Sequence, residues 1–278
     1  MIVVTGASGV IGRAFIRRLK AECLPFVVLD RETLIGATCL VDLLAGKPSI
    51  VVHLAASVPQ PPVIPDNEEN AAITKKIDKR ILDAVNLWGC HAIYVSGCSL
   101  YPKGHPLQMS EDMIDAEYVT QSFYLAAKQW GEQSFMTTGQ ATILRISAPI
   151  GEGLPKSTVI GRFIDMARSD GNLDIWGSGQ REQNYVDVID IADALFRSMV
   201  VRPCEVINIS ADYPITMLVL AKKIVEIFGR GFVRMTNKLD PRDGETARYS
   251  NVKAGEILGW RPSIPIEDSL ETLRRGYL

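Results

Sequence analysis

The sequence predicts an α/β protein in which a doubly wound parallel sheet is followed by a smaller α/β cap. Three observations indicate this fold class. Short β-branched runs alternate with amphipathic helical stretches through the first half of the chain. A glycine turn connects the first strand to the first helix. After about residue 150 the alternation becomes irregular, so we place a dinucleotide-binding domain at 1–150, with returns near 185–210, and the substrate-binding cap mainly at 151–278.

The first strand, turn and helix form the most informative stretch. Residues 2–4 predict a buried strand, residues 10–20 have helical periodicity, and Gly6, Gly9 and Gly12 lie between them. Such a turn lets backbone N–H groups and the positive end of a helix meet a pyrophosphate. Gly6 is expected to form the tight turn, Gly9 to let the phosphate approach, and Gly12 to let the helix pack against the strand.

The residues after the second strand bear on the choice of cofactor. The apolar run 26–29 ends in Asp30, and an acidic residue about 20 positions beyond the glycines can bind a ribose 2′-hydroxyl, as in NAD sites. Arg31 would favour a 2′-phosphate and therefore NADP, whereas Asp30 would repel one. NAD is the favoured cofactor, and NADP stays open.

The remaining elements follow in order along the chain. A short segment at 41–44 is followed by an expected strand at 50–54 and a proline-rich loop at 58–66. Further along, we expect strands at 92–95 and 142–146 and helices at 70–88 and 123–136. The small residues Ala55 and Ala56 leave room for a cofactor at a strand end. In the second half we expect strands at 173–176 and 206–209, a strand then a helix over 185–200, helices at 159–167, 217–228, 252–258 and 266–275, and an irregular polar stretch at 230–250.

Composition excludes several classes of protein. The net charge is −2 and the basic residues do not cluster, which argues against nucleic acid as a partner. No apolar run approaches the roughly 20 residues of a membrane helix, and the first strand begins at once, so we expect neither a membrane segment nor a signal peptide. The five cysteines and three histidines lack ligand spacing, which favours reduced thiols in the cytoplasm and no metal site.

Tyr124 and Lys128 are the candidate catalytic pair. They stand four residues apart, on one face of the expected helix. The ordinary pKa of a tyrosine is about 10, and a nearby ammonium lowers it. Such a pair can pass a proton to or from a substrate hydroxyl while hydride moves to or from a nicotinamide.

With these residues, the sequence resembles the extended short-chain dehydrogenase/reductase family, in its NAD-dependent nucleotide-sugar epimerase/dehydratase branch. The matching segments span nearly the whole chain: 5–12, Asp30, Asp42, 53–56, 70–74, Tyr101, Tyr124 with Lys128, Arg145, 177–179, 185–188, Asp190 and 258–262. The resemblance implies a Rossmann domain, a substrate-binding cap, bound NAD or NADP and a homodimer. It also implies that Asp42 contacts adenine, that Lys128 bonds the nicotinamide ribose and that Tyr124 is the acid/base.

The expected cofactor-binding residues are Gly6, Ser8, Gly9, Val10, Ile11, Gly12, Asp30, Arg31, Asp42, Leu43, Leu54, Ala55, Ala56, Ser96, Tyr124, Lys128 and Pro149.

Two positions near the reacting centre depart from the family's pattern. The family's catalytic Ser or Thr, four residues before Tyr101, is Gly97 here, and Ser99 is expected to supply the missing hydroxyl, since it donates better than Cys98. The branch's Asn after the 142–146 strand, which binds the substrate diphosphate, is Ala148.

The expected substrate-binding residues are Ser99, Arg181, Arg242 and Glu245. An arginine of the family's pattern is replaced by Gln183, and Arg181 would take over the phosphate, because side chains two apart on a strand share a face. Arg242 matches the branch's Arg-x-Gly-Asp site, with Glu245 in place of Asp. An arginine's planar fork suits a diphosphate.

We therefore expect an NAD(P)-dependent epimerase or oxidoreductase that acts on a hydroxyl or ketone of a sugar, with a nucleotide-sugar as the favoured small-molecule substrate. A reductase of a smaller carbonyl compound stays open, favoured by Ala148 and Gln183 and opposed by Arg242. A cofactor-binding regulatory protein with weakened catalysis also stays open because of Gly97, although the Tyr124 and Lys128 pair argues against it.

Overall fold

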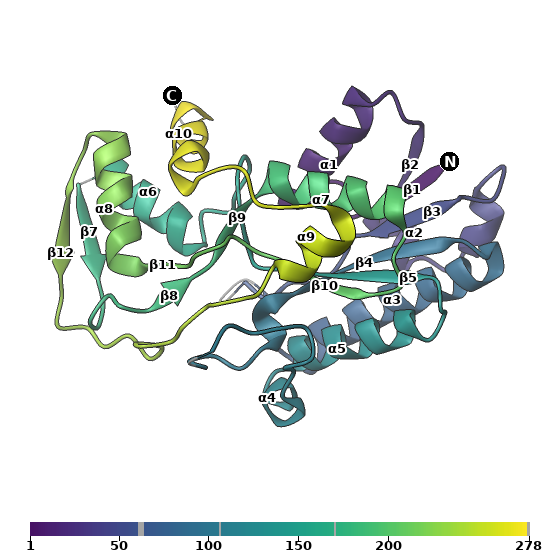
Figure 1. Cartoon of the computed structure of the whole chain (residues 1–278), viewed down its shortest axis with the longest axis horizontal. Helices are drawn as coiled ribbons and strands as arrows, with labels where there is room; N and C mark the ends of the chain where they lie inside the picture. Colours follow the sequence, from purple (N-terminus) through teal and green to yellow (C-terminus); the bar gives the residue numbers. More distant parts are fainter. Residues whose placement is uncertain (61–63, 106, 170, 277–278) are drawn as a thin grey trace.

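A parallel sheet of six strands forms the larger part of the molecule (Figure 1). This computed structural model describes residues 1–60, 64–105, 107–169 and 171–276. The strand order is β10-β5-β4-β3-β1-β2, and all neighbours are parallel. The strands are β1 (Ile2–Thr5), β2 (Phe26–Leu29), β3 (Ile50–His53), β4 (His91–Gly97), β5 (Ala141–Ile146) and β10 (Val206–Ile209). The predicted doubly wound sheet is confirmed.

Helices cover both faces of this sheet. On one face α1 (Val10–Ala21) packs against α7 (Val188–Val201), and on the other α3 (Glu68–Trp88) packs against α5 (Phe123–Met136). Because neighbouring side chains of a strand point to opposite faces, Val4 enters the core under α1 while Val3 enters the core under α3. A strand that is buried on both faces has a continuous apolar sequence, which explains why residues 2–4 are all apolar.

The cap has an apolar core of its own. It is built from α6 (Val159–Ser169), α8 (Met217–Phe228) and α10 (Ile266–Gly276), which pack with a pair of parallel strands, β7 (Asn172–Ile175) and β12 (Phe232–Met235). A second pair, β8 (Glu182–Gln183) and β11 (Ile215–Thr216), is antiparallel. Between the sheet and the cap, β6 (Ala148–Ile150) pairs with β9 (Tyr185–Asp187), and these two strands connect the two parts.

Several elements differ from the sequence prediction. The strand β12 lies inside the stretch 230–250 that we expected to be irregular; it is a largely exposed edge strand, so it lacks the apolar pattern of a buried one. Residues 41–43 of the segment 41–44 lie in a 3₁₀ helix, η1 (Leu40–Leu43), and the segment adds no strand to the sheet. Short helices not predicted are α2 (Arg31–Ile35), η2 (Cys98–Leu100) and α4 (Ala116–Thr120), and the short strands β6, β8 and β11 were not predicted either. The predicted loop 58–66 includes residues 61–63, which lie outside the described residues.

The chain returns to the sheet at a second place within 151–278, the range that we expect to be mainly cap. There α9 (Val252–Leu258) and Trp260 pack in the core under α1 and α7. Trp260 donates its indole N–H to the Asp190 carbonyl at 2.9 Å, which fixes this return on α7. The chain therefore comes back to the sheet twice after residue 150, at 188–209 and again at 252–260.

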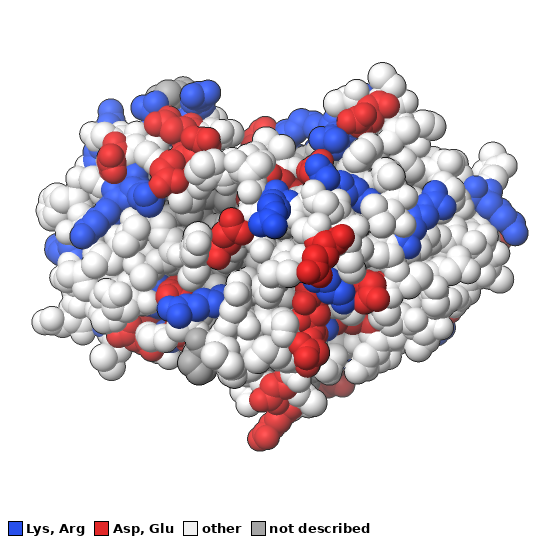
Figure 2. Space-filling model, in the orientation of Figure 1, with Lys and Arg blue, Asp and Glu red and all other residues white. Residues whose placement is uncertain are grey.

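Lys and Arg side chains are interspersed with Asp and Glu over the face shown in Figure 2. No helix among the described residues combines the length and the apolar character that spanning a membrane requires.

Candidate active site

A hollow of about 960 Å³ opens where the carboxyl ends of the sheet strands meet the cap. Its walls come from the glycine turn at 6–13, from 54–60 after β3, from Val95 and Ser99 near the end of β4, and from cap residues that include Arg181 and Arg242. In an open parallel sheet, the crevice outside the strand ends is where ligands bind. Segments far apart in the sequence thus form one continuous site.

The glycine turn leaves no room for side chains where the strand meets the helix. Gly6 has a φ of +67°, and a Cβ on it would lie 2.8 Å from the Ala55 nitrogen. A Cβ on Gly12 would lie 2.1 Å from the Gly6 carbonyl oxygen, so only glycine lets α1 pack this closely. At Gly9 the nearest atom would be 3.3 Å away. These distances agree with the tight turn expected at Gly6 and with the close helix packing expected at Gly12.

The N-terminus of α1 is open to an anion. Its N-cap residue, Gly9, has no side-chain oxygen to offer the first-turn N–H groups, and the first turn contains no acidic residue. Free N–H groups and the helix dipole give this end a partial positive charge. Ser8, Val10 and Ile11 line the hollow beside it. The residues present therefore fit a pyrophosphate, the central group of NAD and NADP.

Arg13 connects this helix end to the cap, a role that the sequence did not reveal. Its guanidinium donates to the carbonyl of Ser8 and, at 3.2 Å, to the carbonyl of Gly153. A Cβ on Gly153 would collide with the Arg13 guanidinium, so this loop glycine makes the contact feasible. The partner is 140 positions away in the chain, and no local motif could have indicated it.

Asp30 lies at the end of β2, as predicted, and lines the hollow. Its Oδ1 accepts a hydrogen bond from the Thr33 N–H at 2.8 Å, which caps α2 and lowers the pKa of the carboxyl. Arg31, Leu54, Ala55, Ala56 and Pro149 also line the hollow.

Three other expected cofactor contacts lie elsewhere. Asp42 and Leu43, in η1, are exposed and are not among the described residues that line the hollow. Ser96 does not line it either, but its Oγ is buried and has no hydrogen-bond partner among the described residues. A buried hydroxyl without a partner is costly, so Ser96 has a donor free for a bound group.

The candidate catalytic pair lies on α5, and hydrogen bonds hold the N-terminus of this helix in place. Ser122 caps the helix by accepting from the Leu125 N–H, and Asp66 accepts from the Tyr124 N–H at 2.9 Å and from the Ser122 hydroxyl at 2.6 Å. Lys128, one turn later, is buried and donates to the Val95 carbonyl at 2.7 Å. Tyr124 and Lys128 are not among the described residues that line the hollow, but Lys128 binds the backbone of Val95, which does.

Other groups in the structure oppose the electrostatic effect that we expect within this pair. Burial raises the pKa of Tyr124, and the carboxylates of Asp78 and Asp66 raise it further. Burial also lowers the pKa of Lys128. The Lys128 ammonium donates to a carbonyl and lies 3.8 Å from the centre of the Tyr94 ring, so its charge is directed at those groups. The phenol of Tyr124 is therefore held in its protonated form.

Ser99 occupies the space left by Gly97. A Cβ on Gly97 would lie 3.0 Å from the Ser99 Oγ, so the hydroxyl sits next to where a side chain at position 97 would begin. Ser99 lines the hollow. Cys98 is buried instead, its thiol donates to the Arg145 carbonyl at 3.2 Å, and burial raises its pKa. The geometry thus favours Ser99 over Cys98 as the substitute for the missing hydroxyl.

The arginines of the substrate end differ in how much of their charge is available. Arg181 and Gln183 both line the hollow, in keeping with a shared strand face, but Arg181 is paired with Asp240 at 2.9 Å and only 15% of its side chain is exposed. Arg242 also lines the hollow; it is 51% exposed, and its Nε lies 3.9 Å from the nearest oxygen of Glu245. Glu245 is not among the described residues that line the hollow.

Lys103 and Arg145 differ in their position relative to the hollow, a difference that the sequence did not predict. Lys103, which we did not predict, lines the hollow and donates to the Tyr249 hydroxyl at 3.3 Å, and burial lowers its pKa. Arg145, which matched the family pattern, lies outside the hollow in a buried ion pair with Glu132 at 2.7 Å and donates to the Tyr101 hydroxyl at 2.9 Å. Its place in the motif therefore reflects packing.

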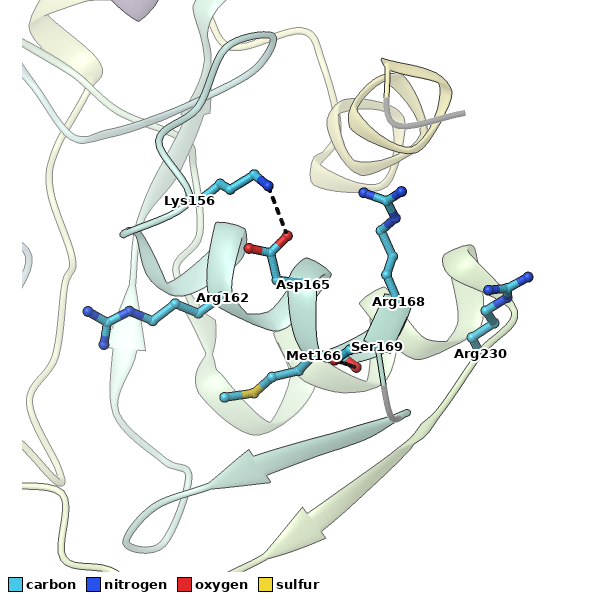
Figure 3. A pocket seen from close by; sticks show the side chains of 7 residues that line it. All are labelled: Lys156, Arg162, Asp165, Met166, Arg168, Ser169 and Arg230. Carbon is cyan, nitrogen blue, oxygen red and sulfur yellow. Dashed lines mark hydrogen bonds and ion pairs between the residues drawn. The ribbon is translucent and has the colours of Figure 1, made fainter.

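A second hollow, of about 600 Å³, lies on the cap and contains none of the predicted site residues. Figure 3 shows its cationic side chains pointing apart: Arg162 and Arg230 extend in opposite directions, and Lys156 faces Asp165, 3.9 Å away. Its cations do not converge on a common point, so we assign the active site to the larger hollow.

Comparisons with known proteins show what the chain is similar to. Over 306 residues the chain is 24% identical to the putative GDP-L-fucose synthase 2 of Arabidopsis thaliana, covering 100% of this chain and 91% of that protein. Over 303 residues it is 24% identical to the UDP-glucose 4-epimerase of Mycolicibacterium smegmatis, covering 96% of this chain and 95% of that protein. The solved structure of MoeE5 in complex with UDP-glucuronic acid and NAD shares the fold, with a TM-score of 0.84, 22% identity and 99% coverage of both chains. Residues 2–210 match the NAD dependent epimerase/dehydratase family, and the chain belongs to that family.

Proposed function

We propose that the protein is an NAD(P)-dependent epimerase or reductase that acts on a hydroxyl or ketone of a nucleotide-sugar. One observation supports this most strongly: a single hollow runs from the open helix end at Gly9 to the hydroxyl of Ser99 and the guanidinium of Arg242. The relatives that the chain resembles are named for GDP- and UDP-sugars, and MoeE5 was solved with a UDP-sugar and NAD.

At the cofactor end the backbone of the glycine turn would bind the pyrophosphate, and Asp30 would bind the adenosine ribose. The lowered pKa of Asp30 keeps its exposed carboxylate charged, which opposes a 2′-phosphate and favours NAD. Lys128 and the free hydroxyl of Ser96 would hold the nicotinamide half. When bound, the nicotinamide supplies or accepts the hydride.

At the reacting centre Tyr124 would exchange the proton. Its raised pKa keeps the phenol protonated, which is the form that donates to the oxygen of a substrate ketone. Ser99 would donate a second hydrogen bond to the same oxygen, in the place of the hydroxyl missing at Gly97. Action in the other direction, on a hydroxyl, requires that the pKa of Tyr124 fall, and we assign that effect to the Lys128 ammonium.

At the substrate end Arg242 would bind the diphosphate. It is the more exposed of the two predicted arginines, and its carboxylate neighbour Glu245 lies at the edge of ion-pair distance. Arg181 is already paired with Asp240, so we assign it the positioning of this wall, a correction to its expected role.

A binding panel tests this function. Thermal unfolding is measured with NAD, with NADP and with UDP-, GDP- and dTDP-sugars in the presence of the better cofactor. At a hundred times its Kd a ligand stabilises the folded state by about 2.7 kcal/mol, so a true substrate class gives a clear rise in Tm. We expect NAD and at least one nucleotide-sugar to do so. No stabilisation by any nucleotide-sugar would favour the smaller carbonyl substrate.

The proposal includes a homodimer in the cytoplasm. We place its interface on the outer face of α3, where Leu87 is 62% exposed. All five cysteines are free, which suits a reducing compartment. Light scattering on the purified protein measures the mass of the assembly, and a monomer at micromolar concentration would remove the dimer from the proposal.

A further inference from the structure

A chain of buried polar groups runs beneath the active site, from the sheet to helix α5. Asp78, on α3, is completely buried. One of its oxygens is 2.9 Å from His53 Nε2, and the other accepts from the Tyr94 hydroxyl at 2.7 Å. On its far side the His53 ring places Nδ1 2.7 Å from the Thr5 hydroxyl. Four polar residues are thus connected in a row inside an otherwise apolar core.

The hydrogen bonds fix the direction of every proton in this row. The Thr5 hydroxyl oxygen accepts from the backbone N–H groups of Leu54, at 3.2 Å, and Ala55, at 3.1 Å, which occupies both of its lone pairs. Its own hydrogen must therefore go to His53 Nδ1, and the ring proton of His53 is left on Nε2. His53 and Tyr94 then both donate to Asp78, which acts as an acceptor through both oxygens, as an ionised carboxylate does.

The Tyr94 side chain lies between Asp78 and Lys128 and contacts both. The Lys128 ammonium lies 3.8 Å from the ring centre, on the residue whose hydroxyl is bonded to Asp78. Gly131 makes this fit possible, because a Cβ there would lie 2.1 Å from the Tyr94 hydroxyl oxygen and 2.7 Å from Asp78 Oδ2. Helix α5 can pack over the buried pair only where it has no side chain.

Two buried carboxylates, Asp78 and Glu132, act on Lys128, and they differ in whether a cation binds them. The titratable groups that influence Lys128 or Asp78 are His53 from β3, Tyr94 from β4, and Tyr124 and Glu132 from α5. Glu132 is bound by the Arg145 guanidinium at 2.7 Å, and no lysine or arginine of the described residues forms an ion pair with Asp78. A buried charge is costly unless an opposite charge is near.

We propose that Asp78 is a positioning residue of the active site: a buried counter-charge, held by His53 and Tyr94, that keeps the Lys128 ammonium charged through the Tyr94 ring. The proposal rests on the proposed function in one respect, that Tyr124 and Lys128 are the catalytic pair. The shifts of the ionisable groups agree with it, because Asp78 opposes the effect of burial on the pKa of Lys128 and adds to the raised pKa of Tyr124.

The test removes the charge of Asp78 and keeps its shape, in Asp78→Asn. The titration of the Lys128 side chain is followed by NMR in the protein without cofactor or substrate. We expect the pKa of Lys128 to fall by about one unit or more, the size of effect that a nearby opposite charge has. An unchanged titration in a folded Asp78→Asn protein would overturn the proposal. If that variant does not fold, Asp78→Ser, which leaves room for water, allows the same comparison.

Two matched variants separate the charge from other causes. Asp83→Asn removes a carboxylate from the same helix, where Asp83 is exposed and pairs with Lys79 at 2.9 Å, and it should leave Lys128 unchanged. Tyr94→Phe keeps both the ring and the Asp78 charge, so the pKa of Lys128 should stay within a few tenths of a unit. A fall equal to that of Asp78→Asn would mean that the Tyr94 hydroxyl, and not the charge, is responsible, and would refute the proposal.

A kinetic readout distinguishes positioning from damage. In Asp78→Asn the pKa values of both Tyr124 and Lys128 should fall, so the whole pH profile of kcat should move toward acid. A merely structural defect would lower kcat at all pH values without moving the profile. The NMR titration involves no turnover, so its failure is distinguishable from a failure of the proposed function, which would show as full activity of Tyr124→Phe.

Discussion

The two ends of the active-site hollow are built in different ways. The cofactor end is made of backbone: a glycine turn with no room for a Cβ on Gly6 or Gly12, and a helix end whose N–H groups no side chain of the described residues caps. The substrate end is made of side chains from distant segments, with Ser99 after β4, Arg181 before β8 and Arg242 in the stretch after β12. The first end is fixed by local conformation, and the second by how the cap folds onto the sheet.

This difference predicts which changes are tolerated. At the cofactor end one added methyl group should be severe, because it meets immovable backbone. At the substrate end single substitutions should have graded effects, because several side chains share the work. The following variants test that contrast, from the largest expected effect to the smallest.

Tyr124→Phe should give the largest loss, since it removes the group that exchanges the proton between the two ends. We expect kcat to fall by about a thousandfold, within the range for loss of a general acid or base, with the Kd of NAD nearly unchanged. Steady-state kinetics and calorimetry measure the two quantities. Activity close to that of the unmodified protein would contradict the role given to Tyr124.

Gly12→Ala should weaken cofactor binding by about a hundredfold and lower stability by about 1–3 kcal/mol. The added Cβ would lie 2.1 Å from the Gly6 carbonyl oxygen, so the turn or the helix must move. Thermal unfolding with and without NAD measures both effects. Gly46→Ala is the matched control, because a Cβ there meets no atom within 4 Å, and it should behave like the unmodified protein.

Ser99→Ala should lower kcat by roughly tenfold or more, the cost of losing one hydrogen bond to a developing charge. The reverse experiment adds Gly97→Ser to that variant. Since a Cβ on Gly97 would lie next to the position of the Ser99 hydroxyl, the double variant should regain part of the lost rate. Single variants at Ser99 with unchanged kcat would show that the substrate oxygen lies elsewhere.

Arg242→Gln and Arg181→Gln should differ in kind. Arg242 is half exposed, so its loss should raise the Kd of a nucleoside diphosphate about tenfold with little change in Tm. Arg181 is mostly buried and paired with Asp240, so its loss should chiefly lower Tm by leaving that carboxylate without a partner. Equal effects of both variants on binding and on Tm would erase the distinction that we draw between them.

The sequence predicted what depends on neighbours along the chain. The strand, turn and helix at 1–21 and the bounds of α5 follow from local apolar patterns and caps, and the structure confirms both. It could not predict the pairing of Arg13 with Gly153, the pairing of Arg181 with Asp240, or Lys103 in the wall, because each depends on how the cap meets the sheet. The exposed strand β12 was missed because half-exposed edge strands lack an apolar signature.

The groups that oppose Lys128 at Tyr124 could not be predicted for the same reason. A lysine four residues along a helix predicts a lowered pKa, but burial and two carboxylates from elsewhere in the chain, Asp66 and Asp78, raise it. Neither carboxylate is near Tyr124 in the sequence, and burial is a property of the whole fold. Charge effects on a buried group therefore need coordinates, even where the pair itself is evident from its spacing.

A crystal structure of the complex with NAD is the most decisive measurement, because it shows whether the nicotinamide meets Tyr124. We expect a pyrophosphate on the N–H groups that follow Gly9, a nicotinamide ribose bonded to the Lys128 ammonium, and the Tyr124 hydroxyl facing the reactive face of the nicotinamide beside Ser99. A dinucleotide bound away from the glycine turn, or a Tyr124 hydroxyl directed away from the nicotinamide, would contradict it.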